Sequence, residues 1–208
     1  MEKVNWKLSN KLGSHWIKVK FYQEKPKDTD AKILKDVKFC QAIKLAIIQP
    51  VILDKTSLNC AGANCAFGWN DSRDKFVERC RDKNSMPLNT LESILSQAYF
   101  FKKPVEYIGL NTMGKPDLVL SYVSPEQAMA IVKIYQANTG KTLDVSLGGM
   151  MSICGSVAVK THLSKDITFS FGCEDSRKSA GLGRDIMAVG IPERLFEMFV
   201  GNEQYSIK

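Results

Sequence analysis

A strand that passes directly into a helix near the middle of the chain constrains the fold most strongly. Residues 116–123 are rich in the branched apolar side chains that are typical of a buried strand. Ser124 then supplies an N-cap, Pro125 the first helical position and Gln127 the third position of a capping box. This helix is predicted to run to about Ala137. A strand followed at once by a helix indicates an α/β unit.

Further elements follow from apolar periodicity and from the residues that break it. Strands are expected at residues 15–23, 50–54, 105–110, 143–147, 166–171 and 186–190. Helices are expected at residues 5–13, 37–49, 72–84, 89–101, 150–162 and 192–200, and loops at 24–30, 58–68 and 177–184. We see no repeat and no clear linker. The sequence therefore predicts a mixed α/β (α+β) fold, a single compact domain over residues 1–208 with a mixed sheet flanked by helices.

Composition and hydropathy limit the class of protein. Apolar residues make up 44% of the chain and charged residues 25%, which is ordinary for a globular protein. No window approaches the roughly 20 apolar residues that a membrane span requires. The first residues also lack the apolar segment of a secretory signal. We therefore expect a cytoplasmic protein that does not enter a membrane.

The net charge of +7 is concentrated near the start of the chain. Residues 1–55 hold twelve lysines, no arginine and six acidic residues. Such an excess suits an anionic partner. Arginine and exposed aromatic residues, which usually read nucleic acid, are not interleaved with these lysines. We therefore favour a solvated lysine-rich face over a nucleic-acid interface.

Six cysteines are the most informative residues for function. They stand far apart along the chain, at Cys40, Cys60, Cys65, Cys80, Cys154 and Cys173. Structural disulfides are rare in cytoplasmic proteins, so these thiols are inert core residues, reactive groups or metal ligands. Their local surroundings have to distinguish these three roles.

The surroundings of four cysteines favour a cluster site. Cys60 and Cys65 lie in the glycine-containing stretch 58–68, whose small residues let the backbone come close to a bulky group. Cys154 follows a Gly-Gly break, and Cys173 follows a glycine at the end of a predicted strand. Element ends leave backbone N–H groups free to stabilise negative charge on sulfur. Cysteine thiolates in such positions are typical ligands of iron–sulfur clusters.

Competing interpretations stay open for each cysteine. Cys80 shares a helix face with Phe76 and Val77, which favours a small buried hydrophobe. For Cys40, early on its predicted helix, the core and ligand interpretations are balanced. A structural Cys₄ zinc site is less favoured, because such sites use C-x₂-C pairs and the closest pair here is C-x₄-C.

Two other features are better explained by local structure. Gly140 precedes Lys141 and Thr142 as at the end of a phosphate-binding loop, but it follows a helix and is interpreted as its C-cap. The chain has two histidines, His15 and His162. His162 lies eight residues after Cys154, too far along a helix for direct contact, and is interpreted as a residue of the helix C-terminus.

Several short stretches, spread over nearly the whole chain, carry a resemblance to a known family. They read LS at 8–9 with IKVKF at 17–21, KFCQA at 38–42, LNCAGA at 58–63, PDLVL at 116–120, PEQAM at 125–129, SIC at 152–154, GCEDSR at 172–177 and MAVGIP at 187–192. In this order they resemble the family catalogued as domain of unknown function 169. The family name carries no settled activity.

The resemblance implies a shared site. The cysteines within the family pattern are Cys40, Cys60, Cys154 and Cys173, and four is the number of ligands that a [4Fe–4S] cluster requires. These four would then be its metal ligands. Cys65 departs from the pattern and is kept as an alternative ligand or a nearby reactive thiol.

Two classes of function remain. In the first, the protein holds a [4Fe–4S] cluster for redox, sulfur-handling or metal-handling work, which an anaerobic host would favour. Arg177 and Arg184 would then position an anionic small molecule or a redox protein. In the second, a non-enzymatic module binds or stores a metal or a tetrapyrrole, and Met150 and Met151 beside Cys154 would suit a soft metal. The residues do not decide whether the chain is an enzyme, and a homodimer is the default assembly.

Overall fold

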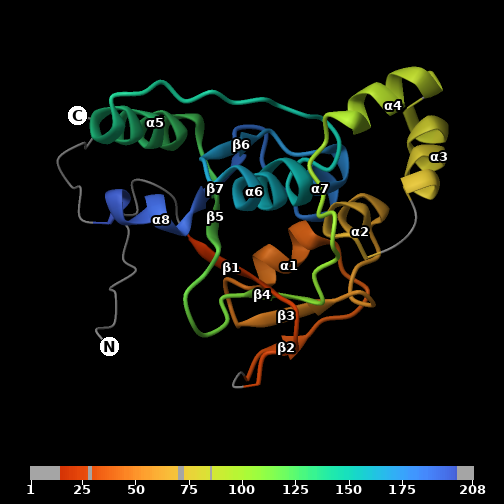
Figure 1. The fold of residues 1–208 in the computed structure, drawn as a ribbon, viewed down its shortest axis with the longest axis horizontal. Helices are drawn as coiled ribbons and strands as arrows, with labels where there is room; N and C mark the ends of the chain where they lie inside the picture. Colours follow the sequence, from red (N-terminus) through yellow and green to blue (C-terminus); the bar gives the residue numbers. More distant parts are fainter. Residues whose placement is uncertain (1–14, 28–29, 70–72, 85, 201–208) are drawn as a thin grey trace.

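The computed structural model describes residues 15–27, 30–69, 73–84 and 86–200, so the helix predicted for residues 5–13 lies outside the described residues. Within them, one mixed sheet of seven strands organises the chain in the order β2-β3-β4-β1-β5-β7-β6 (Figure 1). The strands are β1 Ile17–Tyr22, β2 Lys32–Ile33, β3 Val51–Asp54, β4 Tyr107–Leu110, β5 Leu118–Val123, β6 Thr168–Ser170 and β7 Met187–Pro192. β2 and β3 are parallel, and the other neighbours are antiparallel.

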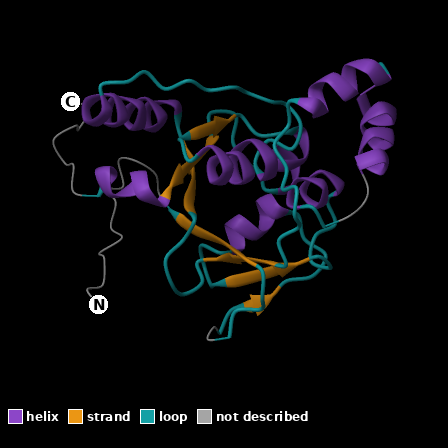
Figure 2. Cartoon of the chain, in the orientation of Figure 1, coloured by secondary structure: helices purple, strands orange, loops and turns teal. Residues whose placement is uncertain are grey.

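Helices flank this sheet, as Figure 2 shows. They are α1 Phe39–Leu45, α2 Ala61–Phe67, α3 Arg73–Asn84, α4 Leu88–Ser96, α5 Pro125–Thr139, α6 Lys160–Ser164, α7 Glu174–Ser179 and α8 Glu193–Phe196, with a π-helix η1 at Cys154–Val159 and a 3₁₀ turn η2 at Glu197–Phe199. The predicted mixed α/β fold is therefore confirmed. In the described part of the chain, no helix combines the length and the apolar character needed to cross a bilayer.

The interior strand β5 contributes side chains to two separate cores, one on each face of the sheet. Leu118 and Leu120 face the first core, which contains buried residues of α1, α2 and η1. Val119 and Val123 face the second core, which contains buried residues of α5 and α8. This alternation follows from the two-residue period of a strand. The cysteine-bearing helices consequently share one face of the sheet.

The start and the end of α5 are as the sequence predicts. The Ser124 hydroxyl accepts a hydrogen bond from the Gln127 amide nitrogen at 3.2 Å, and the Gln127 side chain accepts one from the Ser124 amide nitrogen at 2.8 Å. Gly140 ends the helix with φ +67°. The capping box and the glycine C-cap are both confirmed.

The stretch 58–68 forms a helix for most of its length, so the predicted loop is wrong. α2 occupies Ala61–Phe67, and only Gly68, at φ +73°, has the left-handed conformation for which glycine suits a turn. Alanine has the highest helix propensity of all residues, and three alanines in these seven positions outweigh one internal glycine. Cys60 becomes the N-cap of this helix.

Two further predictions need correction. Residues 143–147 form no strand. The apolar side chains of Leu143 and Val145, which suggested one, pack against the second core although their backbone does not pair with the sheet. The predicted loop 177–184 begins inside a helix, since Arg177 belongs to α7. The remaining predicted elements within the described residues appear with shifted ends.

Gly190 allows the helical segment formed by η1 and α6 to pack closely on β7. A Cβ atom at this position would overlap the Thr161 hydroxyl oxygen and would lie 2.9 Å from Val157 Cγ1. Real Cβ atoms do not come so close to neighbouring atoms. The segment begins at Cys154, so this contact also fixes the position of one cysteine.

We predict that Gly190→Ala lowers the free energy of unfolding by about 1–3 kcal/mol, the usual cost of an overpacked core. Gly149→Ala is the matched control, because its Cβ would meet no atom within 4 Å. Urea denaturation of both variants measures the difference. Equal stabilities for the two variants would contradict this packing argument.

Candidate functional site

A cavity of about 110 Å³ opens beside the first core, between helices from distant parts of the chain. It is lined by Lys38, Asn59, Cys60, Ala61, Gly62, Phe76, Arg79, Cys80, Gly149, Met150, Met151, Cys154, Cys173, Glu174 and Asp175. One water needs roughly 10–15 Å³ on this measure, so the cavity has room for a group of several atoms. Its walls contain four of the six cysteines.

The cysteines reach this region from the starts of four helices. Cys60 is the N-cap of α2, and Cys173 is the N-cap of α7. Cys154 is the first residue of η1, and Cys40 is the second residue of α1. Backbone N–H groups in a first helical turn lack carbonyl partners within the helix, so they favour negative charge nearby.

Electrostatic coupling places Cys40 with the cavity cysteines, although Cys40 does not line the cavity itself. Burial raises the pKa of the Cys40 thiol to about 11, and the charges of Cys173 and Cys60 contribute to the rise. Burial also raises the pKa of Cys154 well above its ordinary value, with further contributions from Cys60, Cys173 and Cys40. Cys60 and Cys173 are therefore close enough to oppose the ionisation of Cys40 and Cys154.

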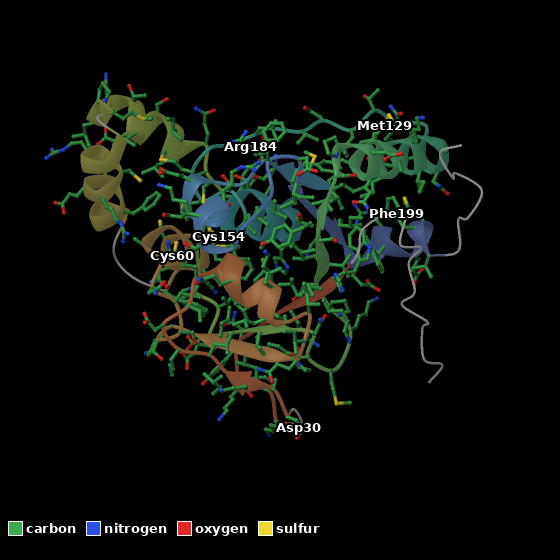
Figure 3. All side chains as sticks on the ribbon, turned by 180° about the vertical axis from the view of Figure 1, so that it is seen from behind. Asp30, Cys60, Met129, Cys154, Arg184 and Phe199 are labelled. Carbon is green, nitrogen blue, oxygen red and sulfur yellow. The ribbon has the colours of Figure 1, made fainter. Side chains whose placement is uncertain are left out.

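Backbone groups partly offset this effect of burial. Burial raises the pKa of Cys60, whereas the N–H groups of Ala63 and Gly62 act to lower it. The N–H group of Gly155 acts in the same direction on the pKa of Cys154. Figure 3 shows the labelled Cys60 and Cys154 side by side, which agrees with their shared cavity. Burial thus favours the protonated thiols of Cys40, Cys60 and Cys154.

Small residues and one unusual backbone conformation shape the cavity wall. A Cβ atom on Gly62 would lie 3.1 Å from Phe76 and 3.2 Å from Met151, so glycine lets α2 come close to both side chains. Met151 has φ +47°, a left-handed conformation that is uncommon for a residue other than glycine. Gly172, at φ +81°, turns the chain from β6 into α7 and so places Cys173. Sterically demanding backbone of this kind is concentrated at functional sites.

Charged groups of both signs surround the thiols. The Lys38 ammonium lies 3.4 Å from an Asp175 carboxylate oxygen, and both residues line the cavity. Glu174 pairs with Lys178 at 2.5 Å, whereas Arg79 is an exposed residue of the wall. Two cations and two carboxylates therefore stand at the edge of the cavity.

Tyr122 and Cys80 belong to this region, and sequence reasoning did not select them. The Tyr122 hydroxyl donates to the Cys40 carbonyl oxygen at 3.3 Å. Burial raises the Tyr122 pKa well above its ordinary value, with smaller contributions from Cys40 and Cys173. Cys80 is buried, as predicted, and also lines the cavity one helical turn after Phe76. Residues four apart lie on the same face of a helix, so the spacing of Phe76 and Cys80 was the sequence feature that could have placed both in one wall.

The other candidate residues do not line the cavity. Cys65 lies in α2, partly buried against the first core. The Arg177 guanidinium donates to the carbonyl oxygens of Gly183 at 2.7 Å, Phe171 at 2.6 Å and Ile186 at 3.3 Å, so it holds the turn after α7. Arg184 is exposed on that turn. Over the residues that the structure describes, no three or more histidine, cysteine or acidic side chains stand close enough to hold a single metal ion.

The raised thiol pKa values predict how stability depends on pH in the metal-free protein. A Cys40 pKa of about 11, against 9.0 for an ordinary thiol, means that the folded state keeps this proton more tightly than the unfolded state does. The contribution of the Cys40 thiol to the free energy of unfolding is therefore fully present below pH 9 and is lost as the pH rises through about 11. We expect Cys40→Ala to reduce the fall in unfolding free energy across that range, measured by denaturation and referred to each protein's value at neutral pH. An unchanged fall would contradict burial of this thiol.

Comparison with known proteins agrees with the resemblance seen in the sequence. The family model of DUF169, described as "Uncharacterised ArCR, COG2043", matches residues 10–202. No curated protein and no solved structure matches the chain. Because the family match covers nearly all of the 208 residues, this chain is a member of the DUF169 family.

Proposed function

We propose that this protein binds a [4Fe–4S] cluster through Cys40, Cys60, Cys154 and Cys173. The observation that carries the proposal is that Cys60, Cys154 and Cys173 line one cavity from three helix starts, and that Cys40, near a fourth helix start, is electrostatically coupled to them. Small buried hydrophobes would have no reason to gather at helix starts around open space. Four thiolates are the usual ligand set of such a cluster.

The electrostatics of the site support a cationic occupant. Thiols must lose their protons to bind metal, and burial opposes this loss at Cys40, Cys60 and Cys154. Iron would replace the protons and remove that cost. The first-turn N–H groups would stabilise the negative charge that remains on sulfur, and hydrogen bonds of this kind tune cluster potentials.

The arrangement also supports a cluster that another molecule can reach. Cys40 and Cys154 are buried, whereas Cys60 and Cys173 are half-buried. A cluster held by these four would be enclosed on the side of the sheet and open on the side of Arg79. We therefore infer a redox, sulfur-handling or metal-handling role in the cytoplasm, with a redox protein or an anionic small molecule as the partner.

A second candidate function rests on two methionines. Met150 and Met151 both line the cavity, so thioether and thiol side chains belong to the same wall. Soft ligands of this kind select copper(I) as well as iron–sulfur clusters. The alternative is therefore a non-enzymatic module that binds or stores a soft metal at the same cysteines.

Anaerobic purification followed by iron and sulfide analysis tests the first function. We expect brown protein with about four irons and four sulfides per chain. Cys60→Ser, Cys154→Ser and Cys173→Ser should each lose most of the iron, because each removes one ligand. Cys65→Ser is the matched control and should keep it, since Cys65 lies inside α2, away from the helix start that carries Cys60, and does not line the cavity. Cys80→Ser should also keep it.

Three results would contradict the cluster. Colourless protein with one zinc per chain would indicate a structural zinc site. Copper without sulfide would support the soft-metal module instead. Loss of iron in the Cys65→Ser variant, with retention in Cys173→Ser, would place the ligands elsewhere on the chain.

A further inference from the structure

A second cavity, of about 430 Å³, lies between the end of β1, the segment 100–105 and α6. It is lined by Phe21, Gln23, Phe100, Phe101, Lys102, Lys103, Val105, His162 and Leu163. None of these residues lines the cysteine cavity. Its volume falls within the range of roughly 300–1,000 Å³ that is usual for small-molecule sites.

Three rings form one wall of this cavity in a mutual edge-to-face arrangement. The ring centroids of Phe21 and Phe101 lie 4.9 Å apart, those of Phe21 and His162 lie 5.0 Å apart, and those of Phe101 and His162 lie 5.4 Å apart. Aromatic rings prefer such geometry, so each ring holds the other two in place. The wall offers an ordered surface to a planar ring.

The backbone on both sides of this wall is held by hydrogen bonds. The Phe21 amide donates to the Asp117 carboxylate at 2.8 Å, and the Phe101 amide donates to the Ala66 carbonyl oxygen at 2.9 Å. These bonds attach Phe21 to the residue that precedes β5 and Phe101 to the end of α2. Because its two anchoring residues are fixed, the wall is preorganised, and a ligand would not have to order it on binding.

His162 contributes a nitrogen that a ligand can use. Its Nδ1 atom is buried without a hydrogen bond and lies 3.8 Å from an Asp117 carboxylate oxygen. Nε2 is then the ring nitrogen left for a contact in the cavity. The Asp117 carboxylate beside Nδ1 favours the neutral tautomer with its proton on Nδ1, which leaves Nε2 to accept a hydrogen bond from a ligand.

The rim of the cavity is cationic. Lys102 and Lys103 are both exposed, and neither has an ion-pair partner among the described residues. The charge of Lys165 also acts on His162. One Asp117 carboxylate oxygen lies 3.8 Å from the ring, and the other accepts the hydrogen bond from the Phe21 amide. Two adjacent lysines that form no ion pair within the described part of the chain attract an anionic group.

We propose that this cavity binds a planar aromatic ligand that carries an anionic group. The ring of the ligand lies against Phe21 and Phe101, and its anionic group lies between Lys102 and Lys103, with His162 as the third polar contact. Aromatic phosphates such as mononucleotides have this chemistry. The proposal does not depend on the cluster, because the two cavities share no residue.

The two cavities are nevertheless connected through one helical segment. Cys154 begins η1, which runs directly into α6, and His162 lies in α6. Eight residues of helix span on the order of 12 Å at 1.5 Å per residue. The ligand site therefore lies at the opposite end of the segment that carries one proposed cluster ligand.

Titration with flavin mononucleotide, followed by its fluorescence, tests the site in the full-length purified protein. Riboflavin supplies the ring without the phosphate, and inorganic phosphate supplies the anion without the ring. We expect flavin mononucleotide to bind at least about tenfold more tightly than riboflavin at low salt, because charged hydrogen bonds add to stacking. The difference should shrink as salt rises.

Two double variants distinguish a direct contact of Lys102 and Lys103 with the phosphate from an effect of the protein's overall positive charge. Lys102→Ala/Lys103→Ala should reduce the affinity for flavin mononucleotide to that for riboflavin. Lys133→Ala/Lys141→Ala removes the same charge from exposed positions outside the cavity and should leave the affinity unchanged. Phe101→Leu should weaken the binding of both flavins. Circular dichroism reports whether that variant folds.

Three outcomes would overturn the proposal. They are absence of binding by flavin mononucleotide up to about 1 mM, equal affinities for the two flavins, and an equal effect of the two lysine pairs. Because the lysines are exposed, their variants test the site without disturbing the core. Iron content and flavin mononucleotide affinity are measured separately on the same full-length protein, so failure of the cluster and failure of this site are distinguishable.

Discussion

Burial of the cysteine side chains removes water from any thiolate that forms there, so ionisation of these thiols costs free energy. The other features of the site act on this cost. Burial raises the pKa values of Cys40, Cys60 and Cys154 together, and each thiolate opposes the ionisation of its neighbours. A core without function would avoid such a group of interacting acids or would fill the space with apolar side chains. Here Cys60, Cys154 and Cys173 line open space from positions where helices begin, and Cys40 is coupled to them electrostatically, which is the observation on which the proposed metal centre rests.

The sheet makes this convergence possible because one face carries every helix that bears a candidate ligand. The alternation of β5 separates that face from the second core under α5 and α8. Gly190 lets the segment formed by η1 and α6 pack on β7, and this contact fixes Cys154 at one end and His162 at the other. A single rigid segment thus connects a cavity lined by sulfur with a cavity lined by aromatic and cationic groups.

The sequence predicted local features well and distant contacts poorly. The strand β5 and the capped helix α5 depend on neighbouring residues, so Ser124, Gln127 and Gly140 were sufficient to place them. The stretch 58–68 was misread because its glycines were weighted above its alanines. No local pattern shows that Cys40 and Cys154 approach each other, since that proximity depends on the pairing of strands far apart in the chain. The family resemblance selected four of the cysteines, but the wall that includes Cys80 and the neighbouring Tyr122 required coordinates.

Anomalous diffraction at the iron absorption edge, from crystals grown without oxygen, tests the central claim most directly. The account predicts four iron peaks inside the space bounded by Cys40, Cys60, Cys154 and Cys173, with each sulfur bonded to a different iron. A cavity without iron in a crystal of brown protein, or iron bound at Cys65 on the outer part of α2, would contradict it.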